Sequence, residues 1–177
     1  MLALRITNIK QIMHLMLDKN ETAFDSFLLS SAEFSTFATL TIDGHLHPDF
    51  YTEEELENLQ SEAASQNRIF SRQMIRWSQA KSQCFDFIKG SKVPLRFLIV
   101  LYLAEENVAR FLAGIDTTLT ARDIAGLSLN IKYDGTNLTA TCAASLNIFT
   151  PDRTVDQAWD SMIQKFFDKH EIPYEIL

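Results

Sequence analysis

The sequence is poor in cysteine, and its two cysteines are not arranged as a pair. Cys84 and Cys142 lie far apart in a chain of 177 residues, with no C-x-x-C between or around them. Both sit in apolar patterns, which predicts buried free thiols in a reducing cytosol. Thirteen phenylalanines supply the core instead, since burying each contributes about 1.5–3 kcal/mol. The fold therefore needs no disulfide or metal staple.

Long apolar runs are also absent. The longest, residues 97–104, is far below the ~20 residues of a spanning helix. Arg5, Lys10 and His14 interrupt the apolar start of the chain before the core of a signal peptide can form. We therefore expect a soluble, cytoplasmic protein with no membrane partner, and one domain over residues 1–177.

The common catalytic motifs are missing as well. The chain has no G-x-S-x-G, no G-x-G-x-x-G and no EF-hand loop. The segment Lys89–Lys92 is not a phosphate-binding P-loop, because it follows a predicted helix and lacks the required spacing. No catalytic residue and no cofactor is predicted, and we lean against an enzyme.

Hydrophobic periodicity predicts an α+β protein: an antiparallel β-sheet with helices packed on it. The expected strands are residues 2–7, 27–42, 45–51, 94–103, 108–115, 124–133, 137–146 and a docked tail at 171–177. The expected helices begin at about residues 7, 52, 70 and 154. Apolar residues on both faces of 95–103 predict a central strand that is covered on both sides.

Turn signals mark several boundaries. Asp134-Gly135 predicts a hairpin, Thr52 with Glu55 predicts a capping box, and Gly90 is placed to end a helix. The order of turn, capped helix, Phe-Asp, proline and strand occurs after residue 43 and again after residue 134. This order suggests an internally duplicated β-hairpin/helix unit.

Short sequence pieces spread over nearly the whole chain resemble those of one family. The pieces are residues 39–44 (TLTIDG), 84–90 (CFDFIKG) with Pro94, 129–131 (LNI) with Tyr133, and 149–152 (FTPD) leading to Trp159-Asp160. In these the chain is similar to a family of small bacterial proteins of unknown function. The resemblance implies a bacterial, soluble, single-domain protein, and it brings no activity, cofactor or site residue with it.

The protein has a net charge of −7, but one segment of the chain is basic. Residues 68–96 carry seven lysines and arginines against Asp86 alone. Arg68, Arg72 and Arg76 are spaced four residues apart, so on a helix they would lie on one face. The basic residues predicted to bind an anion are Arg72, Arg76, Lys89, Lys92 and Arg96. The open alternative is that they pair with the glutamates of residues 53–62, in exposed ion pairs worth only ~0–1 kcal/mol each.

Two histidines offer a weaker metal-binding hypothesis. His45 and His47 are two positions apart, so in a strand they would share a face. The only other histidines, His14 and His170, fall on predicted helices. We favour a solvated hairpin tip and predict no metal site.

The leading hypothesis is a non-enzymatic binding module. Its basic ridge at residues 68–96 would contact a nucleic acid, a nucleotide or an acidic protein. The alternative is a small enzyme or ligand-binding protein with a pocket between the sheet and the last helix, walled by Trp159, Phe166 and Phe167. A homodimer built on an exposed sheet face or edge is a third hypothesis.

Overall fold

The computed structural model describes all 177 residues and confirms the α+β architecture, with one antiparallel sheet and five α-helices. The strands are β1 (Leu2–Ile6), β2 (Phe27–Ser35), β3 (Thr39–Asp43), β4 (Ile75–Arg76), β5 (Arg96–Leu103), β6 (Ile124–Tyr133), β7 (Leu138–Leu146) and β8 (Tyr174–Ile176). The helices are α1 (Ile9–Leu17), α2 (Glu53–Ser65), α3 (Trp77–Ile88), α4 (Glu105–Ala113) and α5 (Thr154–Lys169), with 3₁₀ turns at Pro48–Phe50 and Ala121–Asp123.

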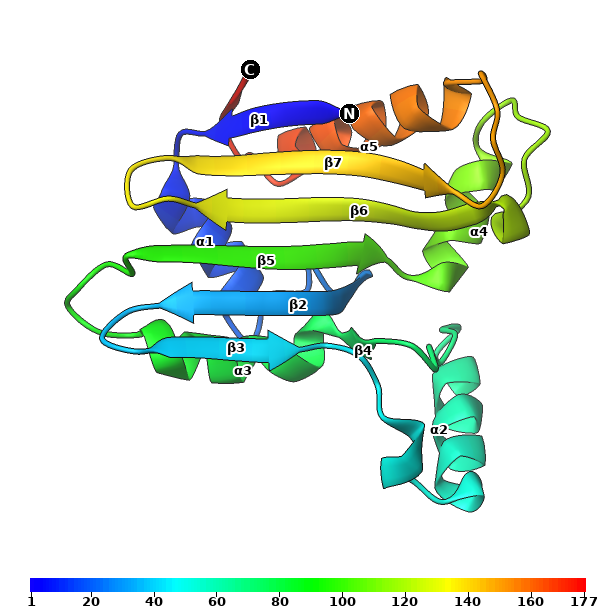
Figure 1. Cartoon of the computed structure of the whole chain (residues 1–177), viewed down its shortest axis with the longest axis horizontal. Helices are drawn as coiled ribbons and strands as arrows, with labels where there is room; N and C mark the ends of the chain where they lie inside the picture. Colours follow the sequence, from blue (N-terminus) through cyan, green and yellow to red (C-terminus); the bar gives the residue numbers. More distant parts are fainter.

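The sheet runs in the order β3-β2-β5-β6-β7-β1-β8, and the short β4 pairs with β2 (Figure 1). Both ends of the chain lie at the same edge, because the tail docks as β8 antiparallel to β1, as predicted. The hairpin between β6 and β7 is also confirmed. Asp134 Oδ1 accepts hydrogen bonds from the Thr136 and Asn137 amides at 2.9 and 2.8 Å. Gly135 takes the positive φ of 100° that this turn requires.

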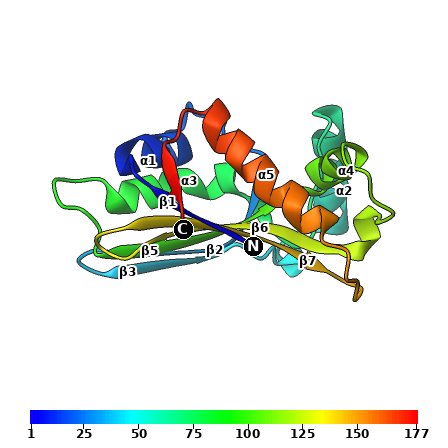
Figure 2. The same ribbon diagram turned by 90° about the horizontal axis from the view of Figure 1, so that it is seen from above.

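All of the helices that pack on the sheet lie on one of its faces, as Figure 2 shows for α1, α3 and α5. The prediction that β5 is covered on both sides is therefore wrong. Phe97, Ile99 and Leu101 are buried beneath the helices, whereas Leu98 is 39% exposed on the open face. Its cross-strand neighbours there are Glu33 and Lys132, polar residues that keep this face compatible with water.

Helix α5 packs on the sheet, where it contacts β7. Trp159 and Phe167 are completely buried, and the Trp159 indole Nε1 donates to the Ser128 carbonyl at 3.0 Å. Large aromatic side chains packed in this way make a solid core. Of the side chains that the alternative hypothesis assigns to pocket walls, Trp159 and Phe167 are thus core residues, and the partly buried Phe166 packs against this core.

The strand expected over residues 27–42 is two strands. A tight turn at Thr36–Ala38 divides it, and Phe37, which broke the alternation in the sequence, stands at the tip with 91% of its surface exposed. Residues 45–51 do not return along the sheet, since only His45 forms a bridge, to Met74. The turn at residue 43 therefore leads out of the sheet, whereas the turn at residue 134 joins two paired strands. The two halves do not form one repeated unit.

Two further segments differ in type from the prediction. The segment expected to be a strand, residues 108–115, lies mostly in helix α4, which begins at Glu105. Glu105 and Glu106 lie in its first turn, where the helix dipole favours acids. Residues 69–74 are irregular, with a bend at Arg72 and Gln73, and they lead into β4, so α3 begins only at Trp77. Consequently Arg68, Arg72 and Arg76 do not share a helix face.

Candidate functional site: a basic-rimmed apolar groove

A groove opens at the end of the sheet where α3 gives way to β5. It is a cavity of about 730 Å³ between α1, the end of α3 and the loop of residues 89–94, within the ~300–1,000 Å³ typical of ligand sites. Its apolar lining is Ile9, Met13, Leu17, Phe85, Ile88, Val93, Pro94, Phe97 and Tyr133. We call this cavity the lysine groove, after the cations at its rim.

The rim carries more positive than negative charge. Lys10, Lys89 and Lys92 line it together with His14, against Asp18 as the one carboxylate. Lys89 is paired with Asp86 on the exposed surface at 2.8 Å. Lys10 and Lys92 form no ion pair and no side-chain hydrogen bond, so their ammonium groups are free to meet an anion.

Local sequence places the loop beside the groove. Helix α3 ends when the Lys89 amide donates to the Phe85 carbonyl at 2.8 Å, and Gly90 then turns the chain with φ at 151°. The Leu95 amide donates to the Ser35 carbonyl at 2.8 Å and leads the chain into β5. The loop is thus held at both ends while its side chains face outward.

The same loop borders a second cavity on its other side. This cavity, of about 380 Å³, is lined by Phe37, Phe87 and residues 88–93 with Leu95. Four apolar side chains around the loop are strongly exposed: Phe37 at 91%, Val93 at 71%, Leu95 at 68% and Phe85 at 47%. Clustered exposed apolar residues of this kind are typical of an interaction site.

Only two of the five predicted anion-binding residues meet in the structure, namely Lys89 and Lys92. Arg76 lies at the opposite end of the sheet, where its guanidinium is paired with Glu106 at 2.8 Å in a largely buried site. Arg72 is exposed beside α2, with its guanidinium nitrogens 2.9 and 3.0 Å from the Gln60 side-chain amide. Arg96 is exposed on the open sheet face, 3.9 Å from Glu33.

The acidic helix does not neutralise the basic segment. None of the glutamates at residues 53–62 forms an ion pair, and the carboxylate that holds Arg76 belongs to α4. The structure also adds Lys10, which the sequence pattern does not connect with the basic segment. Lys10 lies on α1 one turn before Met13 and His14, so helical spacing places these three side chains on one face of α1. Nothing in the sequence, however, connects α1 with the loop at residue 90.

The histidine pair is an exposed turn feature. His45 Nδ1 lies 2.6 Å from Asp43 Oδ1, and the His45 backbone amide donates to the same oxygen at 3.0 Å. The backbone hydrogen bond, followed by that of the ring, lowers the pKa of the Asp43 carboxyl. No group of three or more potential metal ligands gathers anywhere in the structure, including around His47.

Neither cysteine is set up as a nucleophile. Burial raises the pKa of the Cys84 thiol to about 12. The pKa of Cys142 is likewise raised to about 12, by burial and then by the Asp160 carboxylate, whose Oδ1 lies 3.1 Å from the sulfur. Because the thiolate is the reactive form, both thiols are inert at neutral pH.

The architecture defines an α+β protein with helices on one face of an antiparallel sheet, and none of its helices is long and apolar enough to cross a membrane. The chain belongs to DUF5721, a family of unknown function, whose model matches residues 14–175. This confirms the resemblance seen in the sequence. No curated protein and no solved structure matches the chain significantly.

Proposed function

We propose that this protein is a bacterial, cytoplasmic, single-domain binding module without catalytic activity, and that the lysine groove docks an acidic, apolar segment of a partner protein. The observation that carries the proposal is the pair of free ammonium groups, Lys10 and Lys92, at the rim of an apolar floor. Glutamate or aspartate side chains of the partner would meet the lysines, while its apolar side chains would cover the floor.

Charge favours an acidic partner at this place. The protein as a whole carries −7, so acidic segments are repelled from most of its surface and attracted only where cations prevail. Rim charges of this kind act mainly on the rate and specificity of association. The apolar floor then supplies affinity, at roughly 1.5–3 kcal/mol for each large side chain that is fully buried.

The extent of the surface favours a peptide over a small molecule. Residues 88–93 border two cavities, of about 730 and about 380 Å³, and the exposed Phe37 and Leu95 extend the apolar area beyond the lysine groove. Nucleic acid fits less well, because phosphate binding needs a continuous track of cations. In the structure that track is broken, since Arg72, Arg76 and Arg96 lie on other surfaces.

Selection from a random twelve-residue peptide library tests the proposal. We expect enriched peptides that combine acidic and apolar residues and shift the NMR signals of residues 88–95. Reversing Lys10 and Lys92 to glutamate should weaken their binding about tenfold or more, since close charge pairs across an interface are worth ~1.5 kcal/mol or more. Lys165→Glu, on the exposed side of α5, is the control for the general change in charge.

Three results of this selection would contradict the proposal. If no peptide is enriched, if the enriched peptides are basic or uncharged, or if Lys165→Glu weakens binding as much as the groove variants do, the proposal is wrong. A salt-sensitive mobility shift with single-stranded or duplex DNA that depends on Lys89 and Lys92 would assign the groove to nucleic acid instead. Dimerisation through the open sheet face is a separate prediction, which light scattering tests.

A further inference from the structure

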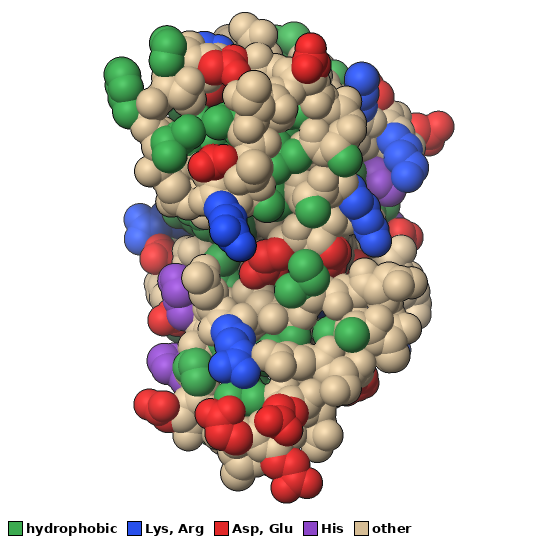
Figure 3. Space-filling model, turned by 90° about the vertical axis from the view of Figure 1, so that its right-hand side faces the viewer, with side chains coloured by type: hydrophobic (Ala, Val, Ile, Leu, Met, Phe, Trp, Pro, Cys, Tyr) green, Lys and Arg blue, Asp and Glu red, His purple; other side chains and the backbone are tan.

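The segment between β3 and α3 forms a lobe beside the sheet. Helix α2 projects from the body in Figure 1 and buries only Leu56. Figure 3 shows acidic side chains gathered at the far end of this lobe and a crease between the lobe and the rest of the molecule. The turn that follows α2, residues 66–68, lies close to α4, and two small chambers lie there.

The first chamber is entirely polar and contains three arginines. It has a volume of about 300 Å³, and Arg68, Arg76 and Arg110 line it from three different elements. The other lining residues are Thr22, Asp25, Ser26, Gln66, Asn67, Glu106 and Asn107. A small cavity walled only by polar groups offers a ligand hydrogen bonds and charge, and no apolar contact.

The charges of this chamber do not cancel. The Glu106 carboxylate is held by Arg76 at 2.8 Å, and Asp25 lies 3.5 Å from the ammonium of the buried Lys81. Arg68 and Arg110 form no ion pair; Arg110 donates only to the Asn107 side chain, at 3.2 Å. The Glu106 carboxylate thus has a close partner, whereas Asp25 Oδ1 has only its ionic contact with Lys81 and no hydrogen bond. The guanidinium groups of Arg68 and Arg110 are left for an anion.

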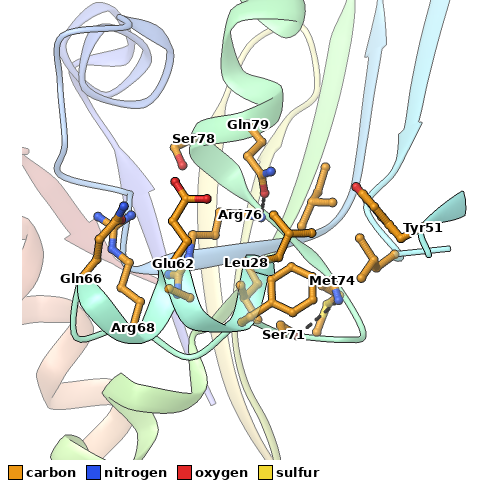
Figure 4. A pocket seen from close by; sticks show the side chains of 15 residues that line it. Leu28, Tyr51, Glu62, Gln66, Arg68, Ser71, Met74, Arg76, Ser78 and Gln79 are labelled. Carbon is orange, nitrogen blue, oxygen red and sulfur yellow. Dashed lines mark hydrogen bonds between the residues drawn. The ribbon is translucent and has the colours of Figure 1, made fainter. Parts of the chain in front are cut away.

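The second chamber adjoins the first and is different in chemistry. Its volume is about 220 Å³, and it shares Gln66, Arg68 and Arg76 with the polar chamber. In Figure 4, Gln66 and Arg68 lie at one end of it and Tyr51 lies at the other. Phe70 also contributes to its wall, and its remaining apolar lining is Leu28, Leu46, Leu59, Ala63, Met74 and Ile75.

We propose that the two chambers together bind a phosphorylated small molecule of the nucleotide class. Its phosphates would occupy the polar chamber, because the planar guanidinium fork matches phosphate oxygens in geometry and charge. Its flat ring would occupy the chamber that holds Tyr51 and Phe70, where aromatic side chains offer a face for stacking. This site is independent of the lysine groove, which lies at the opposite end of the sheet.

Isothermal titration calorimetry with ADP, inorganic pyrophosphate and adenosine tests both halves of the assignment. ADP should bind most tightly, because only ADP fills both chambers. Arg68→Gln and Arg110→Gln should each weaken ADP and pyrophosphate about tenfold, as expected when a hydrogen bond to a charged group is lost. Tyr51→Leu should weaken ADP and leave pyrophosphate unchanged.

Arg122→Gln is the matched control, since Arg122 is exposed, unpaired and outside both chambers. Equal weakening by Arg122→Gln would reduce the effect to general electrostatics and overturn the proposal, as would the absence of ADP binding at low salt. Pyrophosphate binding as tight as that of ADP would overturn the nucleotide assignment. Circular dichroism of each variant confirms that it is folded.

Discussion

Two ion pairs in this protein have the same nitrogen–oxygen distance, 2.8 Å, but opposite exposure to water. The side chains of Arg76 and Glu106 are 14% and 9% exposed, whereas those of Lys89 and Asp86 are 58% and 66% exposed. If burial decides the energy of a pair, removing one charge from each must give very different results. We therefore predict that Glu106→Gln destabilises the protein strongly and that Asp86→Asn barely does.

The magnitude follows from the contacts of Glu106. Its Oε1 accepts from Arg76, its Oε2 accepts from the Ile69 amide at 3.3 Å, and Arg76 also donates to the Ile69 carbonyl at 3.1 Å. Breaking a fully buried pair costs ~3–5 kcal/mol because the remaining charge is uncompensated. With some residual exposure we expect about 2–4 kcal/mol here, against ~0–0.5 kcal/mol for the exposed pair.

Urea unfolding measured by tryptophan fluorescence is the assay, since Trp77 and Trp159 are both completely buried. For a chain of this size the expected loss corresponds to a fall in Tm of about 4–16 °C, at ~2–4 °C per kcal/mol. The double variant Arg76→Gln/Glu106→Gln should recover part of the loss, because it leaves no unpaired charge. Equal effects of Glu106→Gln and Asp86→Asn would refute the reasoning.

Three further predictions concern other elements. Thr52→Ala removes the side-chain oxygen that accepts from the Glu55 amide at 3.2 Å, and this should destabilise α2 by about 0.5–2 kcal/mol. Amide hydrogen exchange should become faster in α2 alone, and unchanged exchange there would contradict the role of the cap. With pKa values of about 12, Cys84 and Cys142 should react with a thiol reagent at pH 8 only after unfolding in urea, and fast labelling of the native protein would show that they are accessible. Hydrogen bonds from the β6–β7 turn lower the pKa of Asp134, so their contribution is present above the unfolded value of ~3.9 and is lost as the pH falls through the folded value. The stability deficit of Asp134→Ala should therefore shrink between pH 7 and pH 2.5, and a constant deficit would argue against this linkage.

The lysine groove and the arginine chambers were only partly predictable. Lys89 and Lys92 are predictable from the sequence because they flank Gly90, which is a local signal. For Arg68 the sequence predicts only membership of a basic helix face, and this face does not form. No local pattern connects Lys10 or Arg110 with these sites, since their neighbours there come from distant parts of the chain.

What the sequence determined by itself is local. The hairpin at Asp134-Gly135, the capping box at Thr52 and the end of α3 before Gly90 each depend on residues a few positions apart. The same is true of the apolar stripe of α5, whose period places Trp159 and Phe167 in the core. The α+β class follows from adding such local patterns together.

Which faces are covered and which charges are paired follows from the packing of the whole chain. The apolar residues of β5 indicated two buried faces, but all the helices that pack on the sheet lie on the same side, so Leu98 faces water. Likewise Arg76 is held by Glu106 of α4 and not by the acidic α2. Burial and ion pairing depend on residues that are distant in sequence, and their partners become known only when the chain is folded.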